Sequence, residues 1–340
     1  MKSLLITAAA LALFAPDAVL LESKHTEGEV RRTTVQYEKV TSLVEMTASQ
    51  NGQEMPPMEG MEQEQSVSRT GSFVDKALKV EEGDLLVFER EYVEFQESHS
   101  MSMSGPMGSQ SNDGETESEL NGKRVHFEVE DGEFVASYPE DQDGDDEWLE
   151  GLDAELPWAQ FLGTGDLNVG DEWEVEPRLV WRALNPGGQL SFTDENGQTG
   201  QPTIDIDEIE FDGAVKAKLV AIEDVDGAPH AQISITLEFV AISDLTELMA
   251  NQEAPEDAPA GMPMPDIDSM IFESDYTGEA SLSWSIGTGA MQSFELTYEI
   301  EETQIMELSF EMGPETMSIE QMMTFEGEGS LTVSQEEGRE

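Results

Sequence analysis

Residues 156–175, LPWAQFLGTGDLNVGDEWEV, divide a chain that otherwise reads as strand after strand. Just before this stretch, Trp148, Leu152 and Leu156 recur at every fourth position, which is the spacing of one face of a helix. Pro157 has no backbone N–H with which to continue a helix, so we expect the helix to end or kink there. The sequence therefore predicts one short helix at the centre of the chain.

The second part of the quoted stretch predicts a strand that is entered through a tight turn. Gly170 and Asp171 form the turn signal. Alternate residues of an extended chain point to the same side, so one side should carry Leu167, Val169, Trp173 and Val175. Large aromatic residues bury much apolar area. We therefore expect Trp173 to be buried in the core and to pack against the predicted helix near Trp148 and Leu152.

This arrangement resembles a group of uncharacterised exported bacterial β-sheet proteins that have a central Leu-Pro pair followed by Val-Gly-Asp-x-Trp. The resemblance covers most of the chain in layout. In motif it covers only the residues to which we assign a structural role: Leu156, Pro157, Val169, Gly170, Asp171 and Trp173. The resemblance implies an exported protein with many long strands, and it implies no particular activity.

Alternating apolar and polar residues dominate both sides of the centre. Runs of this kind, joined by Asp-Gly and Glu-Gly turns, are typical of antiparallel sheets with one solvated face. The strands are longer than the usual ~5–6 residues, which favours strongly curved sheets and allows an incomplete barrel. The predicted fold is all-β and mainly antiparallel, with two curved meander sheet halves and one short central helix. The halves should span residues 24–145 and 204–335, with the helix and the Val-Gly-Asp-Glu-Trp region in 146–203.

The first residues predict an export signal. Lys2 precedes the apolar run LLITAAALALF, and small residues follow, so cleavage between Ala15 and Ala18 would remove residues 1–18. The run is shorter than the about 20 residues that a membrane-spanning helix needs. The chain has no cysteine, which excludes disulfides, zinc–thiolate sites and a cysteine nucleophile. We expect a periplasmic or extracellular protein without a transmembrane segment.

The charge is extreme, with 74 acidic residues against 16 basic ones and a net charge of −58. Proteins that bind nucleic acid need a basic surface, so we expect no nucleic-acid partner. Such a surface also repels itself unless salt or bound divalent cations screen the charge. A saline habitat is the simplest explanation.

No motif predicts catalysis. The four histidines, His25, His99, His126 and His230, lie outside the known hydrolase and metalloprotease patterns. Carboxylate pairs are too numerous to mark a glycosidase site, and no glycine-rich phosphate loop is present. We therefore expect a protein that is not an enzyme: a binding or structural module of the cell envelope, whose partner is another envelope protein or a small hydrophobic ligand. In the latter case the apolar face of a curved sheet would carry the ligand.

Methionine-bearing segments suggest a soft metal such as Cu(I), which prefers thioether sulfur. The most compact group is His99, Met101, Met103 and Met107. The alternative is that methionine is simply tolerated in flexible loops, and this alternative is favoured by the acidic surroundings, which suit hard cations as well.

An acidic run offers a second metal hypothesis. Asp141, Asp143 and Asp145 in DQDGDDE resemble the start of a calcium-binding loop, but Asp146 and Leu152 stand where glycine and glutamate are required. Asp145 can also cap the predicted helix. The alternative is a solvated acidic linker, and we expect no cofactor unless calcium or copper binds at one of these places.

Counting connections places the methionine-bearing segments. In an up-and-down meander, alternate connections lie at the same end of the sheet. One end of the first half should therefore carry segments 50–64 and 99–118, and the other end the turns 81–84 and 131–132. In the second half, segments 247–269 and 312–316 should share an end.

Overall fold

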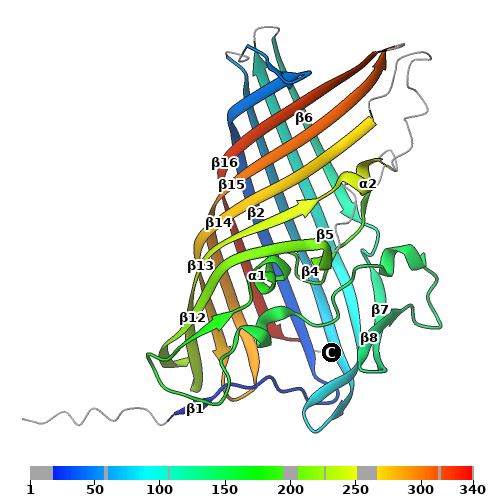
Figure 1. Ribbon diagram of the computed structural model, residues 1–340. Coiled ribbons are helices and arrows are strands. Elements are labelled where there is room, and N and C mark those ends of the chain that lie inside the picture. Colours follow the sequence, from blue (N-terminus) through cyan, green and yellow to red (C-terminus); the bar gives the residue numbers. More distant parts are fainter. Residues whose placement is uncertain are drawn as a thin grey trace, which may run out of the picture.

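The computed structural model describes residues 18–56, 60–105, 108–193, 206–225, 227–250, 266–312 and 315–338. Within them the chain is all-β, as predicted. One curved 14-stranded antiparallel sheet forms the body of the molecule, and a small two-stranded sheet pairs β1 (Val19–Leu20) with β9 (Asp166–Leu167) (Figure 1). The predicted signal segment lies outside the described residues, apart from its last residue.

The first meander holds the N-terminal strands. Its order is β2 (Val30–Gln50), β4 (Glu62–Glu81), β5 (Asp84–Gly105), β6 (Gly108–Ser118) and the short β11 (Phe192–Thr193). Strand β3 (Gln53–Glu54) pairs with β2. Strand β7 (Lys123–Glu130) pairs with the first part of β5 and with β8 (Glu133–Ser137). The β7–β8 hairpin turns at Asp131 and Gly132, which both have positive φ as a tight two-residue turn requires.

The second meander holds the C-terminal strands. Its order is β10 (Glu172–Val175), β12 (Ile209–Val225), β13 (Ala228–Asp244), β14 (Asp266–Ser285), β15 (Ala290–Met312) and β16 (Glu315–Glu337). Helix α2 (Thr246–Ala250) follows β13. Strand β16 pairs with β2 from Ile319 opposite Gln50 to Glu337 opposite Arg31, so the two meanders form one sheet. The sheet is curved but not closed, because no described strand joins its two edges.

The predicted placement of the connections is confirmed. Strands β2 and β5 end beside the start of β4 and β6, at the same end as the β15–β16 connection. We call this end the rim. We call the opposite end, with the β4–β5 and β14–β15 turns, the base (Figure 1). One part of the expectation is wrong, because residues 99–105 and 108–118 are strand and not loop.

The central helix is displaced from its predicted position. Residues 145–156 form only a 3-10 turn, η1 (Asp146–Leu149), because Gly151 follows with a φ of 74° that breaks any helix. Pro157 begins the 3-10 helix η2 (Pro157–Phe161) instead of ending one. The α-helix of this segment is α1 (Pro177–Leu184), which follows the predicted turn and strand instead of preceding them. Pro177 suits its first position, where no N–H is needed. A further 3-10 turn, η3 (Ile206–Glu208), precedes β12.

The central segment, residues 146–193, packs on one face of the sheet, which we call the concave face. Two apolar clusters result. The first core joins η2 and α1 to the second meander and includes Trp158, Phe161, Leu179, Val180, Ile235, Leu282, Trp284, Met291 and Leu296. The second core lies in the first meander and consists of Phe73, Phe88, Tyr92, Phe95, Leu120, Val125, Phe127 and Phe192. Leu156 contacts both clusters.

A polar belt crosses the concave face above the first core. Tyr298 donates to the Tyr37 hydroxyl at 3.1 Å, Lys39 Nζ donates to both carboxylate oxygens of Glu302 at 3.0 and 3.2 Å, and Arg69 donates to Glu97 at 2.6 Å. The belt separates the base, where the two cores lie, from the rim.

Beyond the belt the concave face carries half-buried apolar side chains together with polar ones such as Gln304 and Gln321. Directly paired residues of antiparallel strands point to the same side. By this register, this rim face carries Met46, Met270, Phe272, Met306, Leu308, Ile319 and Met323.

Candidate functional site

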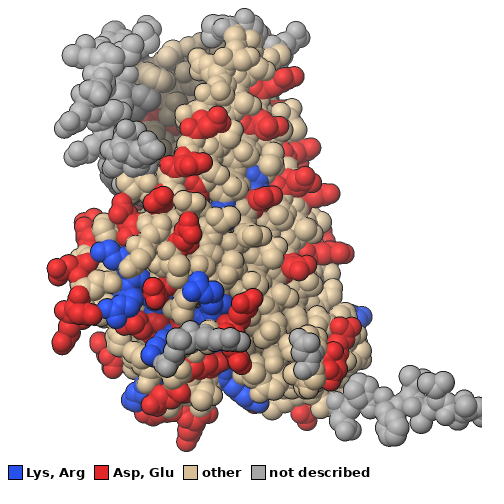
Figure 2. Space-filling view, turned by 180° about the vertical axis from the view of Figure 1, so that it is seen from behind, with Lys and Arg blue, Asp and Glu red and all other residues tan. Residues whose placement is uncertain are grey.

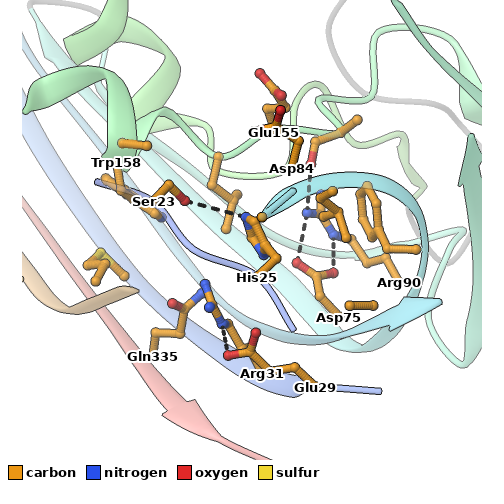
Figure 3. A pocket seen from close by; sticks show the side chains of 18 of the residues that line it. Ser23, His25, Glu29, Arg31, Asp75, Asp84, Arg90, Glu155, Trp158 and Gln335 are labelled. Atoms are coloured by element: carbon orange, nitrogen blue, oxygen red, sulfur yellow. Dashed lines mark hydrogen bonds and ion pairs between the residues drawn. The ribbon is translucent and has the colours of Figure 1, made fainter. Parts of the chain in front are cut away.

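A cavity of about 290 Å³ lies at the base, between the two cores. Its walls come from places far apart in the sequence: the N-terminal segment with Ser23 and His25, the base ends of β2, β4 and β5, the linker before η2, and strands β14 to β16 (Figure 3). The cavity therefore sits where the two meanders meet and where the central segment crosses them. This volume is close to the lower limit for small-molecule sites.

Two tryptophans form part of the apolar wall. Trp158 on η2 is 3% exposed and Trp284 on β14 is 2% exposed, and both line the cavity. Trp158 packs on Phe294 with ring centroids 5.0 Å apart. The indole N–H groups of both tryptophans are buried without a hydrogen-bond partner among the described residues. Buried donors are nearly always paired in folded proteins, and these two are exceptions that the surrounding protein atoms cover.

The charged groups of the wall are largely paired with one another. Arg31 Nε donates to Glu29 at 2.6 Å, and its Nη2 donates to the Lys24 carbonyl at 2.6 Å. Arg90 donates to both carboxylate oxygens of Asp75, at 2.7 and 3.0 Å (Figure 3).

Among the residues that line the cavity, His25 has the side chain that enzymes use most often for acid–base catalysis. Its backbone N–H donates to the Gly83 carbonyl, and its ring lies 3.4 Å from the Ser23 hydroxyl. Burial lowers the pKa of His25, and the positive charge of Arg31 lowers it further. The ring is therefore neutral at pH 7. The serine–histidine distance is longer than the ~2.6–3.2 Å of an activated nucleophile, and Ser23 is exposed.

The residues of the Leu-Pro pair and of the Val-Gly-Asp-x-Trp motif shape the segment beside the cavity, but they contribute no polar group to its wall. Pro157 is buried and begins η2, and Leu156 lines the cavity. Gly170 has a φ of 104°, and Asp171 accepts a hydrogen bond from the Asn168 N–H at 2.7 Å, which completes the predicted turn.

Trp173 differs from expectation. It is half-buried, its indole donates to the Phe161 carbonyl at 2.9 Å, and it packs against the first core. The expectation that it packs near Trp148 and Leu152 is wrong, because these two residues pack against the second core. Val169 is 42% exposed, so it does not share a buried side with Leu167 and Val175.

The copper hypothesis stays a prediction. His99, Met101 and Met103 lie at alternate positions of β5, on the concave face, and Met107 lies outside the described residues. The His99 ring covers Gly114 of the neighbouring strand so closely that a Cβ at this glycine would overlap it. Cross-strand packing thus explains His99 without a metal. Titration with Cu(I) of the wild-type chain and the Met101→Ala/Met103→Ala variant tests the hypothesis.

The calcium hypothesis finds no support in the arrangement of its carboxylates. Asp141 binds Arg124 through both oxygens, at 2.8 and 2.9 Å, and Asp145 accepts from the Glu147 N–H as the cap of η1. Within the described ranges no group of three or more His, Asp or Glu side chains comes together as a metal site, and the calcium hypothesis stays a prediction.

Sequence reasoning missed the cavity. Its residues come from distant segments, and no motif links His25, Asp75, Arg90 and Trp284. The one local signal was the placement of Trp158, a large aromatic residue, directly after the Leu-Pro pair.

Among the described residues, no helix is both long and apolar enough to cross a membrane. No protein-family profile matches the chain, and no curated protein matches it in sequence. Among solved structures, an outer membrane channel from Pseudomonas putida F1 is similar over 92% of this chain and 97% of that chain, at 9% identity and a TM-score of 0.25.

Proposed function

We propose that this chain is an exported, non-catalytic binding protein that holds a small molecule in the base cavity. One observation carries the proposal: a cavity of about 290 Å³ lies between two packed cores, and its lining includes the aromatic residues Trp158, Trp284, Phe88 and Phe134.

The surroundings support binding. The wall stands on strands of the large sheet and on η2, and Arg90 holds the linker in place through the Asp153 and Ala154 carbonyls at 2.8 and 3.1 Å. Sites on such elements are preorganised and require little ordering when a ligand binds. The absence of a catalytic motif from the sequence and the long Ser23–His25 distance favour a role without chemistry.

The proposal also assigns a cellular compartment to the protein. The apolar run behind Lys2, the absence of cysteine and the net charge of −58 support export to the periplasm or the cell exterior. The resemblance to exported bacterial β-sheet proteins rests on the Leu-Pro and Val-Gly-Asp-x-Trp residues alone and agrees with this assignment.

Native mass spectrometry of the chain purified from its own host tests the proposal. We expect a bound small molecule in the wild type and its loss in Ala159→Phe, which places a ring in the cavity wall. Val220→Phe is the matched control, because Val220 is 44% exposed and does not line the cavity. The proposal fails if the wild-type chain carries no ligand and also fails to bind naphthalene, a small apolar probe.

The rim face supports a second candidate function, the transport of a hydrophobic molecule. Met46 lies opposite Met323, and Met270 lies opposite Met306, on half-buried strands beyond the polar belt. Methionine adapts its shape to irregular apolar ligands. N-phenyl-1-naphthylamine should fluoresce on this face and lose that signal in Met270→Glu/Met306→Glu, whereas Ala159→Phe should leave it unchanged. An equal signal in the glutamate variant would exclude this function.

A further inference from the structure

We infer that the rim face holds a site for a soft monovalent metal ion, of the class of Cu(I) and Ag(I), bound by methionine sulfurs. Its residues are Met46, Met323, Met306 and Met270, which we call the methionine row. The row lies beyond the polar belt and shares no residue with the base cavity, so the inference does not depend on the function proposed there. It also shares no residue with the His99 cluster that the sequence suggested.

The four methionines come from four neighbouring strands. Met46 of β2 is paired directly with Met323 of β16, and Met306 of β15 is paired directly with Met270 of β14. Met306 and Met323 are diagonal neighbours, because Met323 is paired with Gln304, two positions away from Met306. All four side chains therefore point to the concave face and form one continuous row. Only the strand order brings these distant parts of the sequence together.

The spacing of the row suits a single small ion. Directly paired residues have Cβ atoms about 4.5–5.5 Å apart, and diagonal neighbours about 7–8 Å apart are still within reach of long side chains. Methionine carries its sulfur on an unbranched chain with three rotatable bonds, so sulfurs from adjacent strands can turn towards one point. Met306 and Met323 are the central residues of the row. An ion between them takes its third sulfur from Met46 or Met270.

Packing in a core does not account for the row. None of its four members belongs to the first or the second core, and all four are half-buried. A strand that needs only an apolar face is normally built from β-branched and aromatic residues. The first core follows this rule with residues such as Ile233, Ile235 and Phe239. The rim instead places a thioether on each of four adjacent strands.

The surroundings of the row favour a soft ion over a hard one. Thioether sulfur suits Cu(I), whereas Ca(II) and Mg(II) require oxygen ligands. Uncharged side chains lie beside the row on β14, β15 and β16, namely Phe272, Gln304, Leu308, Ile319 and Gln321. Glu302, a diagonal neighbour of Met323, is already bound by Lys39 at 3.0 and 3.2 Å. The net charge of −58 attracts cations in general, and the sulfurs select among them.

Isothermal titration calorimetry with silver nitrate tests the inference on the full chain. Ag(I) has the charge and the softness of Cu(I) and does not oxidise in air, and excess Ca(II) occupies the surface carboxylates. Loss of a group that supports a metal ligand typically costs about 10–100-fold in affinity. We therefore expect Met306→Leu/Met323→Leu to weaken Ag(I) binding at least tenfold, because leucine keeps the apolar volume and deletes the sulfur.

Met101→Leu/Met103→Leu is the matched control. It removes two thioethers of the same face from β5, which β4 separates from the row, and these side chains are 40% and 37% exposed. The control should bind Ag(I) as tightly as the wild type. The inference is overturned if the wild type binds no Ag(I), if the row variant binds it as tightly as the wild type, or if the control loses as much affinity as the row variant.

Nuclear magnetic resonance of the wild type, isotope-labelled at its methionine methyl groups, gives a readout that needs no folded double variant. Silver bound to sulfur shifts the adjacent methyl resonance. We expect the resonances of the row to move during the titration and that of Met291, buried in the first core, to stay in place. Resonances of the row that stay in place would overturn the inference. The function proposed for the base cavity is unaffected by any of these results, because naphthalene and Ag(I) probe different residues.

Discussion

Arg90 places a positive charge inside the second core, where its side chain is 1% exposed. The guanidinium lies 4.4 Å from the Phe73 ring and is bound by both oxygens of Asp75. It also donates to the Asp153 and Ala154 carbonyls. A single side chain thus joins β4, β5 and the linker that forms the cavity wall.

Removing the partner of this charge should be costly. We expect Asp75→Ala to lower the free energy of unfolding by about 3–5 kcal/mol, because the arginine would stay buried without its counter-ion. Glu172→Ala is the control: it breaks the exposed pair with Lys218, at 2.6 Å, and should cost less than ~1 kcal/mol. Urea unfolding measures both. Similar losses in the two variants would contradict the role of the buried pair.

Tyr92 yields a prediction for alkaline pH. Its hydroxyl is buried and makes no hydrogen bond of good geometry among the described residues; burial raises its pKa to about 12, although the adjacent Arg90 guanidinium partly offsets this rise. The unfolded chain releases this proton near pH ~10, whereas the folded chain keeps it. The wild type should therefore lose stability as the pH rises from about 10 to about 12.

Tyr92→Phe removes the part of this loss that Tyr92 contributes, because phenylalanine does not titrate, whereas the buried Tyr276 and Tyr298, whose pKa values burial also raises, keep their own contributions. At pH 7 we expect the variant to be at least as stable as the wild type, since the substitution deletes an unpaired buried hydroxyl. Unfolding midpoints of the two proteins between pH 7 and pH 12 check both statements. A marked loss of stability in the variant at pH 7 would mean that the hydroxyl has a partner after all.

At the scale of the element, aromatic side chains lie across glycines of neighbouring strands. Phe95 covers Gly71, His99 covers Gly114 and Tyr298 covers Gly329, and in each pair a Cβ on the glycine would overlap the ring. A glycine weakens a strand by itself, and a ring laid over it restores the lost packing.

Gly329→Ala tests this arrangement. The added methyl group would displace the Tyr298 ring from its place beside Tyr37, and we expect a loss of about 1–3 kcal/mol, as in other overpacked cores. Gly287→Ala is the control, because nothing lies within 4 Å of a Cβ there and the backbone does not require glycine. The control should change the free energy of unfolding by less than ~0.5 kcal/mol. Equal effects would show that the ring moves aside freely.

The strands were predictable and the helix was not, for local reasons. Alternation over Ile233–Phe239 or Phe294–Ile300 has one physical reading, a strand with one buried face, and the structure confirms it. The spacing of Trp148, Leu152 and Leu156 predicts a helix as clearly as that alternation predicts a strand. Gly151, between them, adopts positive φ and ends it.

The candidate site was beyond sequence reasoning because it is made by pairing at long range. The position of Trp284 beside Trp158 depends on how β14 crosses the central segment, and no periodicity within either segment encodes this. His99 shows the opposite failure: its spacing to methionines suggested a ligand, whereas the structure gives it a packing role over Gly114.

On the scale of the whole molecule, like charges stand side by side on the outer face of the sheet. Asp275 pairs directly with Glu301, and Glu301 with Glu326, while Glu299 lies opposite Glu328 in the adjacent row. Figure 2 shows acidic side chains along the length of one side of the molecule, with the basic ones gathered nearer its lower end. Directly opposed like charges destabilise a sheet.

Stability should therefore rise with salt. The Debye length shrinks from about 10 Å at 0.1 M to about 3 Å at 1 M, which weakens repulsion across these rows. We expect the melting midpoint to increase with NaCl concentration, and Glu301→Gln/Glu326→Gln to raise the midpoint at low salt and reduce the slope. Differential scanning calorimetry measures both. A flat or falling midpoint would indicate that bound cations already neutralise the acids.

The seam between β2 and β16 also governs when the protein can fold. It joins residues 31–50 to residues 319–337. One edge of β2 therefore stays unpaired until β16, the last strand of the chain, has been synthesised. Pairing at such sequence separation is slow, and an uncovered strand edge invites association with other chains. Folding of the whole sheet can be completed only after the C-terminal hairpin has left the ribosome and, for an exported chain, the translocation pore. The pairing of β16 with β2 is thus the step that completes the sheet.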